Sequence, residues 1–254
     1  NNVISGNIIG HSTQGFLSEA KCGPAEWIQN EPNVGNGSFG IQITGGASRN
    51  IIGGTQAEER NVVAGSAVGI FVSGAATTEN QLLGNYVGLD VYQNPSQIFG
   101  CSTEQCTDLS YRHLKVGNGI GIHISEATGT IIGGTDAAHA NIVVASGTRG
   151  ILIGGSGGVT DGTIIRGNIV GYRPDFGPFA NGFSGIALAE GARNTLVGGP
   201  EEGARNYIRH NINDGVVIYG SNFFPLNRPF NNTVQNNYIA DNTVLGVFLL
   251  GGTY

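Results

Sequence analysis

Charged residues are scarce in this chain: Asp, Glu, Lys and Arg make up 12% of its 254 residues, about half of the usual ~25%. The formal net charge is −6 at pH 7, and the sequence has no run of Lys or Arg. Because nucleic-acid binding requires clustered cations, we expect no nucleic-acid partner. No stretch approaches the roughly 20 consecutive apolar residues that cross a bilayer, so we expect no membrane span.

Methionine is absent, and there are only three cysteines. Because the chain begins at Asn1 without an initiator Met, we expect it to be processed or to be part of a longer polypeptide. Two disulfide pairings are open: Cys101 with Cys106, or Cys22 with one of them. One disulfide with a spare thiol favours an oxidising compartment, so we expect an extracellular or cell-surface location.

Glycine, in contrast, is abundant, with 44 residues, and it punctuates a phrase that returns along the chain. Asn-Ile-Ile-Gly-Gly-Thr at 50–55 recurs as Thr-Ile-Ile-Gly-Gly-Thr at 130–135 and as Thr-Leu-Val-Gly-Gly-Pro at 195–200. Other short phrases, such as Gly-Asn-Ile-Ile-Gly at 6–10 and Gly-Ile-Gln-Ile at 40–43, recur around it in a fixed order. Such self-similarity predicts an array in which each unit buries its apolar face against its neighbours.

Every recurring phrase is a short run of β-branched or aromatic residues bounded by Gly or Asn, which is typical of strands separated by turns. We expect no α-helix, with single helical turns near 57–60 and 137–139 as the exceptions. Strands this short, without two-residue hairpin links, favour parallel coils over the antiparallel blades of a propeller. The sequence therefore predicts an all-β fold: a right-handed parallel β-helix of about seven coils, forming one domain over residues 1–254.

The alternation of Asn-x-Ile-x-Gly-Asn-x-Ile-Gly, Gly-Ile-x-Ile and Asn-x-Ile-Gly-Gly resembles the right-handed parallel β-helix repeat proteins of the pectate-lyase-like fold. The chain is similar to the repeat modules of large secreted and surface bacterial proteins over nearly its whole length outside three inserts. The resemblance implies a fold but no single activity, since this family includes lyases, hydrolases, epimerases, tailspikes, adhesins and modules without a known reaction.

Asparagine recurs at fixed turn positions, and a β-helix brings equivalent positions to about 4.8 Å from each other. We expect ladders of side chains that pass amide hydrogen bonds from coil to coil, in preference to sugar or metal contacts. Three turn positions are predicted. The first holds Asn7, Asn85, Asn168 and Asn237, the second Asn36, Asn118, Asn181 and Asn242, and the third Asn61, Asn141 and Asn206.

Arginine is preferred over lysine: of the 12 Lys and Arg residues, only Lys21 and Lys115 are lysines. This preference suits planar contacts with several donors. Arg49 is equivalent to Arg193 and Arg60 to Arg205, and each lies near acidic residues. We therefore expect ion pairs that cap the turns.

Candidates for catalysis are few. Glu126 and Glu190 occupy equivalent positions two coils apart, about 10 Å by the strand spacing, near the long end for the carboxylates of an inverting glycoside hydrolase. His123 lies beside Glu126, but the residues aligned with it vary so widely that we interpret it as an ordinary exposed position. Arg173-Pro174 lacks the second Arg of the pectate-lyase motif Arg-Pro-x-x-Arg. We predict no catalytic site, with Glu126, Glu190 and His123 as the nearest candidates.

Metal-binding residues show no clustering. The aspartates are scattered over different turns, so we predict no cofactor and no dedicated metal site. Only a weak Ca²⁺ site, completed by backbone carbonyls, stays open.

Three inserts interrupt the repeat, at about 11–36, 89–118 and 172–181, and all are predicted to leave the coils at one turn. Loops of ~25 residues are uncommon unless they are functional. Two interpretations are open: loops packed on their own aromatic residues, or a ridge that binds a ligand or assembles with a partner. The aromatic residues are Phe16, Trp27, Tyr92, Phe99, Tyr111, Tyr172, Phe176 and Phe179.

A β-helix has open strand edges at both ends, and the sequence shows no recognisable capping unit. Two explanations are open: a module cut from a longer β-helix, or a subunit that stacks head to tail on itself. The first functional hypothesis is a non-catalytic extracellular scaffold that forms a filament or part of a surface fibre. The alternatives are a polysaccharide lyase, glycoside hydrolase or polysaccharide-binding module that uses the inserts, and an adhesin or receptor-binding β-helix.

Overall fold

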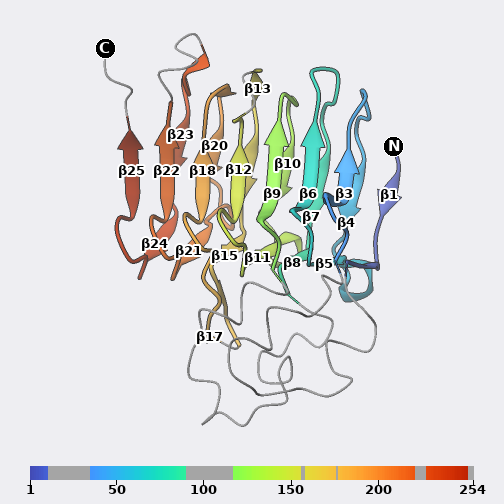
Figure 1. Ribbon diagram of the computed structural model, residues 1–254, viewed down its shortest axis with the longest axis horizontal. Helices are drawn as coiled ribbons and strands as arrows, with labels where there is room; N and C mark the ends of the chain where they lie inside the picture. The colour runs from blue at the N-terminus through green and yellow to red at the C-terminus, as the bar shows by residue number, and fades with distance from the viewer. Residues whose placement is uncertain (11–34, 90–116, 156–157, 176, 221–226, 251–254) are drawn as a thin grey trace.

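The protein is a parallel β-helix of seven coils, seen in a computed structural model that describes residues 1–10, 35–89, 117–155, 158–175, 177–220 and 227–250. Each coil contributes one strand in turn to each of three seven-stranded parallel sheets, A, B and C. The coils follow one another in sequence order from β1 to β25, so the two ends of the chain lie at opposite ends of the stack (Figure 1). The predicted fold is confirmed.

The strands are short in all three sheets. Sheet A holds β1 (Val3–Ile4), β4 (Ile51–Gly53), β7 (Gln81–Leu83), β10 (Ile131–Gly133), β14 (Ile164–Arg166), β20 (Leu196–Gly198) and β23 (Thr233–Gln235). Sheet B holds β2 (Ile8–Ile9), β5 (Val62–Val63), β8 (Tyr86–Val87), β11 (Ile142–Val143), β15 (Ile169–Val170), β21 (Tyr207–Arg209) and β24 (Tyr238–Ala240). Sheet C holds β3 (Phe39–Ile43), β6 (Val68–Ser73), β9 (Ile120–Ser125), β12 (Ile151–Ile153), β18 (Ile186–Leu188), β22 (Val216–Tyr219) and β25 (Val247–Leu250).

Identical or similar side chains stack because the register repeats from coil to coil. In sheet A, Ile132 pairs with Leu82 on one side and with Ile165 on the other, and all three are fully buried. Such columns from the three sheets meet in one continuous core. The repeated phrases of the sequence therefore supply the inward column of each sheet, which alternates with outward residues as a pleated strand requires.

The first glycine of the Gly-Gly phrase is required by the stacking. Gly133 has φ +79, and a Cβ there would lie 2.1 Å from the carbonyl oxygen of Arg166 in the next coil. Its equivalents Gly53 and Gly198 have φ +90 and φ +91 and face backbone oxygens in the same way. Only glycine combines this backbone conformation with so close an approach.

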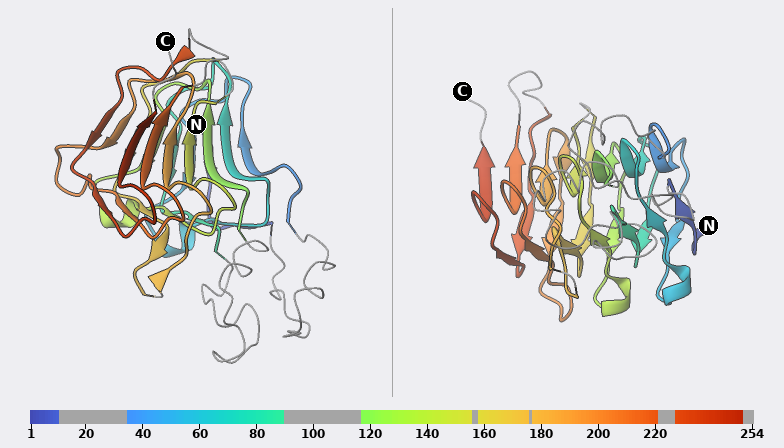
Figure 2. Two further views of the ribbon diagram at one scale, coloured as in Figure 1. Left: turned by 60° about the vertical axis from the view of Figure 1, so that its left-hand side comes forward. Right: turned by 60° about the horizontal axis from the view of Figure 1, so that its bottom comes forward.

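The link between sheets A and B alternates in length. It spans 54–61, 134–141 and 199–206 in coils 2, 4 and 6, but only 84–85, 167–168 and 236–237 in coils 3, 5 and 7. The longer links of coils 2 and 4 contain the single 3₁₀ turns η1 (Ala57–Glu59) and η2 (Ala137–His139), which project from the stack (Figure 2). Both turns confirm the prediction from the sequence.

One asparagine ladder runs through all seven coils at this link. Its members are Asn7, Asn61, Asn85, Asn141, Asn168, Asn206 and Asn237, and each side-chain amide donates to the next at 2.8–3.0 Å. The prediction of two separate turn positions for these residues is wrong. The alternating link lengths hide the fact that these asparagines occupy one position in successive coils.

Two further ladders lie at the other corners. Between sheets B and C, Asn181 donates to Asn211 at 2.9 Å and Asn211 to Asn242 at 2.8 Å. Serines interrupt this ladder: the N–H groups of Ser66 and Ser146 donate to the side chains of Asn118 and Asn181. Asn36 stands at the coil 1 end of this corner, five residues before Ile41. The third ladder, which was not predicted from the sequence, is interrupted at three threonines whose hydroxyls have no hydrogen-bond partner among the described residues. Its column runs through Asn2, Asn50, Asn80, Thr130, Thr163, Thr195 and Asn232.

All three inserts leave the coils between sheets B and C, in coils 1, 3 and 5. The third is an antiparallel hairpin of β16 (Tyr172–Arg173) and β17 (Gly177–Pro178). Most of the first two inserts, 11–34 and 90–116, lies outside the described residues. A small parallel pair, β13 (Thr160–Asp161) and β19 (Ala192–Arg193), adds to the link between sheets C and A.

Candidate functional site

The two candidate carboxylates lie just beyond sheet C. Glu126 and Glu190 follow Ile124 and Leu188 by two residues, and those two positions share one column through Ile153. The two glutamates are therefore equivalent and two coils apart, about 10 Å by the strand spacing. Glu126 has φ +59, and its N–H donates to the Thr160 hydroxyl at 2.7 Å. The structure thus keeps the two carboxylates in separate coils.

His123 is partly buried on the outer face of sheet C, so the interpretation as an ordinary exposed residue is wrong. Its ring centroid lies 5.1 Å from that of Phe71 in the preceding coil, and its Nε2 lies 2.8 Å from the Gly154 carbonyl oxygen. Burial lowers the pKa of His123, and the nearby charge of Arg149 lowers it further, against the hydrogen bond to Gly154. This packing therefore favours the neutral imidazole over the charged one.

Arg149 forms the centre of a cluster on the same outer face. Its guanidinium lies 5.5 Å from the ring centroid of Phe183 and 5.5 Å from that of Tyr219, which it also contacts by a hydrogen bond. Burial raises the pKa of Tyr219, and Glu190 is close enough to raise it as well. We call Arg149, Phe183, Glu190 and Tyr219 the Arg149 cluster.

The Arg149 cluster belongs to a second apolar layer outside sheet C. Leu152, Ala187 and Val217 occupy an outward column, yet they are buried, and Tyr219 and Phe248 pack on them. The Nε of Arg149 is buried and has no hydrogen-bond partner among the described residues. Arg149 is partly exposed, and a guanidinium beside two rings has the chemistry to bind a carboxylate or a sugar ring.

A second set of arginines packs on aromatic rings outside sheet B. Arg60 lies 4.9 Å from the ring centroid of Tyr86 and donates to its hydroxyl. Glu59, the last residue of η1, instead accepts from the backbone N–H groups of Thr55 and Gln56, just before that turn. Arg60 therefore contacts an aromatic ring instead of the predicted acidic residue, whereas Arg49 does form an ion pair, with its Nε 3.1 Å from Oε2 of Glu79. Arg205 donates to the Asn236 carbonyl.

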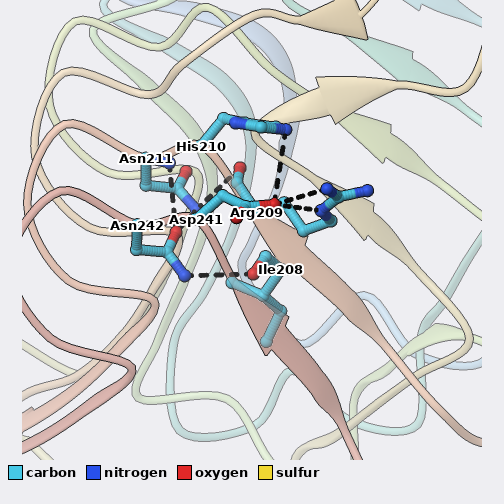
Figure 3. A network of polar contacts seen from close by, with 6 residues as sticks. All are labelled: Ile208, Arg209, His210, Asn211, Asp241 and Asn242. Atoms are coloured by element: carbon cyan, nitrogen blue, oxygen red, sulfur yellow. Dashed lines mark hydrogen bonds and ion pairs between the residues drawn. The ribbon is translucent and has the colours of Figure 1, made fainter.

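Arg209 organises a polar network at the C-terminal end of the same face. It donates to the carboxylate of Asp241, which His210 approaches to 3.9 Å (Figure 3). The Arg209 guanidinium lowers the pKa of Asp241 by this hydrogen bond. The rings of Tyr172 and Tyr238 lie 5.3 and 5.7 Å from the guanidinium carbon. This network links coils 6 and 7 with the third insert.

Two of the predicted ridge aromatics are described, and they differ. Phe179 is buried against Tyr86, Leu89 and Ile142, so it packs as part of a small core. Tyr172 is partly exposed, contacts the His210 ring edge-on and lies beside the Arg209 guanidinium. The other predicted ridge residues and all three cysteines lie outside the described residues: Phe16, Trp27, Tyr92, Phe99, Tyr111, Phe176, Cys22, Cys101 and Cys106.

The end coils expose residues that other coils bury. Val247 and Leu249 of coil 7 lie in the inward columns of sheet C, where Ile151 and Ile153 are fully buried. Leu249 is nevertheless 69% exposed, and at the other end of the stack Ile4 and Ile9 are only partly buried, whereas Ile52 and Val63 in the same inward columns are fully buried. Apolar surface that is core elsewhere is therefore open at both end coils.

Within the described ranges, no group of three or more His, Cys, Asp or Glu residues forms a candidate metal site, and no helix is long and apolar enough to cross a membrane. The chain matches no protein-family model, and neither a curated protein nor a solved structure matches it.

Proposed function

We propose that this protein is a non-catalytic, extracellular β-helical scaffold that associates end to end with copies of itself, as a filament or as part of a surface fibre. The observation that carries this proposal is the exposure of core positions at the end coils. A monomer with these faces in water loses the burial that every internal coil obtains.

The distribution of exposed apolar side chains supports this proposal. Of the 13 exposed large hydrophobic residues in the described part of the chain, eight lie on coils 1 and 7, which are two of the seven coils. They are Val3, Ile8, Tyr238, Val244, Leu245, Val247, Leu249 and Leu250. Among the described residues no strand pairs with the outer edges of β1, β2, β3 or of β23, β24, β25. Open parallel edges bordered by apolar side chains are templates for a further coil.

Sedimentation velocity and electron microscopy over a wide range of protein concentration test the proposal. We expect rods that lengthen as the concentration rises. Leu249→Glu should abolish this lengthening, because it places a charge in the contact, whereas Val159→Glu should not, because Val159 is exposed away from the end coils. A single compact species at every concentration would refute self-association.

A specific observation favours a second candidate function, the binding of an acidic polysaccharide by the Arg149 cluster. The guanidinium of the partly exposed Arg149 and the neighbouring rings of Phe183 and Tyr219 are suited to a carboxylate on a sugar. Titration with pectin and alginate measures the binding. Arg149→Gln should bind more weakly than the unsubstituted protein, and equal binding by the two would reject the site. Release of unsaturated or reducing ends that Glu126→Gln or Glu190→Gln abolishes would instead establish an enzyme.

A further inference from the structure

The asparagine ladder between sheets A and B has a direction. At every rung the Nδ2 of one asparagine donates to the Oδ1 of the asparagine in the following coil, from Asn7 to Asn61 and onward to Asn237. At most rungs the backbone N–H donates to the same oxygen. Donors therefore point toward coil 7, and acceptors point toward coil 1.

The two ends of this ladder are left with complementary groups. On coil 7, the Nδ2 of Asn237 donates to the carbonyl oxygens of Val197 and Gln235, at 2.8 and 3.1 Å. Asn168 makes the two equivalent contacts and also donates to Asn206, whereas no asparagine in the described chain accepts from Asn237. On coil 1, the Oδ1 of Asn7 accepts no hydrogen bond from any described residue, although Asn7 donates to Asn61. The ladder ends in donors on one face and in an acceptor on the other.

The ladder between sheets C and A ends in the same way. Asn2 on coil 1 donates to Asn50 through both its N–H and its Nδ2, and its own Oδ1 has no described donor. Asn232 on coil 7 accepts from Thr195, while its N–H has no described acceptor. Two independent ladders thus have the same polarity at both ends.

Coil 1 also has the dimensions of a coil that could follow coil 7. Asn2 and Asn7 are five residues apart, as are Asn232 and Asn237. The third corner matches too: Asn36 stands five residues before the inward Ile41, and Asn242 stands five residues before the inward Val247. If coil 1 of a second copy followed coil 7, its strands, corner asparagines and inward residues would all align with those of coil 7.

We propose that coil 7 of one copy binds coil 1 of a second copy of this chain, head to tail, so that the Nδ2 of Asn237 donates to the Oδ1 of Asn7. This inference rests on the proposed self-association and adds its direction and register. Two coils 1 facing each other would oppose acceptors, and two coils 7 would oppose donors. The contact is heterologous and leaves the same two faces open on the growing stack.

Disulfide trapping tests the direction. Ile8 and Tyr238 lie in one outward column of sheet B, and both are exposed. A head-to-tail contact places their Cα atoms about one strand spacing apart, ~4.8 Å, within the ~4.4–6.8 Å that a disulfide requires. With the three native cysteines replaced by Ser, a mixture of Ile8→Cys and Tyr238→Cys proteins should form a cross-linked dimer on oxidation. Neither protein should cross-link alone.

The outcomes separate this inference from the proposed function. Cross-linking of Ile8→Cys alone or of Tyr238→Cys alone would overturn the direction. Filaments that form without any mixed cross-link would overturn the contact between coils 7 and 1. Failure of the unsubstituted protein to associate at all, seen by sedimentation, would overturn the proposed function itself.

A matched pair of substitutions tests the ladder. Asn237→Asp and Asn7→Asp each remove an Nδ2 that donates two hydrogen bonds within its own copy. Only Asn237→Asp also removes the donor at the contact and opposes two acceptors there. It should raise the concentration needed for assembly about ten- to a hundredfold, whereas Asn7→Asp should not raise it. Equal effects of the two substitutions, in proteins with unchanged circular dichroism, would overturn the ladder contact.

Discussion

Substitution of Asn168 by Ala should be among the most destabilising single changes in the protein. Asn168 is fully buried at the middle of the continuous ladder. Its Nδ2 donates to the carbonyls of Ile132 and Arg166 and to the side chain of Asn206, at 2.9–3.0 Å. Its Oδ1 accepts from the N–H and the Nδ2 of Asn141, at 3.2 and 2.9 Å. The truncated side chain would make none of these five contacts.

The magnitude follows from the groups left without a partner. The Nδ2 of Asn141 keeps its bond to the Leu82 carbonyl, and the Oδ1 of Asn206 keeps the N–H of residue 168. The Asn141 N–H is left without a described partner, whereas the Ile132 carbonyl still accepts within sheet A, where β10 pairs with β14. At about 1–3 kcal/mol for the buried unsatisfied N–H and about 1 kcal/mol for the side-chain hydrogen bonds lost, we expect a loss of about 2–4 kcal/mol in the free energy of unfolding. The total free energy of unfolding of a typical domain is only ~5–15 kcal/mol.

Urea unfolding followed by circular dichroism measures this loss, with the slope monitored because coil arrays can unfold in steps. Asn237→Ala is the matched control: it removes a ladder asparagine at the partly exposed terminal rung, where water reaches the groups left behind. We expect the control to cost less than about 2 kcal/mol. If Asn168→Ala costs no more than Asn237→Ala, the ladder does not stabilise the fold as described.

Three further predictions concern turns and charges. Gly133→Ala should lower the free energy of unfolding by at least about 2 kcal/mol, because it combines a positive φ with a backbone clash. Gly45→Ala, at φ +66 with open space around the new Cβ, should lower it by about 1 kcal/mol, and equal urea midpoints for the two variants would contradict this. Because burial lowers the pKa of His123, stability should be full above the unfolded pKa of about 6.5 and should fall as the pH drops toward the folded pKa. His123→Phe should remove that dependence, and an unchanged pH profile of Tm would reject it. A carboxyl NMR titration should place the pKa of Asp241 below the ordinary aspartate value, and Arg209→Gln should return it toward that value; no change on substitution would show that the pair is not formed.

The fold could be predicted from the sequence because stacking imposes the same residues on every coil. The recurrent Ile and Val positions became inward columns, and the alanine-containing segments at 57–59 and 137–139 became single helical turns. The continuity of the main ladder was missed because links of two and eight residues alternate along it. A coil-by-coil alignment on the residue two before each inward Val or Ile would have found it.

The outer faces could not be predicted from the repeat. His123 is partly buried because Phe71 of the preceding coil covers one side of its ring, and that neighbour depends on the register of sheet C. Arg60 packs on Tyr86, 26 residues away, although Glu58 and Glu59 are its closest acids in sequence. The outward positions vary freely along the repeat, so periodicity carries no information about which of them meet.

The axial repeat of the assembled protein tests the central claim most directly. Seven coils at a strand spacing of about 4.8 Å, joined without a break at the contact, give an axial repeat of about 34 Å. Cryo-electron microscopy of the protein at high concentration should show filaments with this repeat and with every subunit pointing the same way. Compact single subunits under all conditions, or filaments whose subunits alternate in direction, would contradict the account.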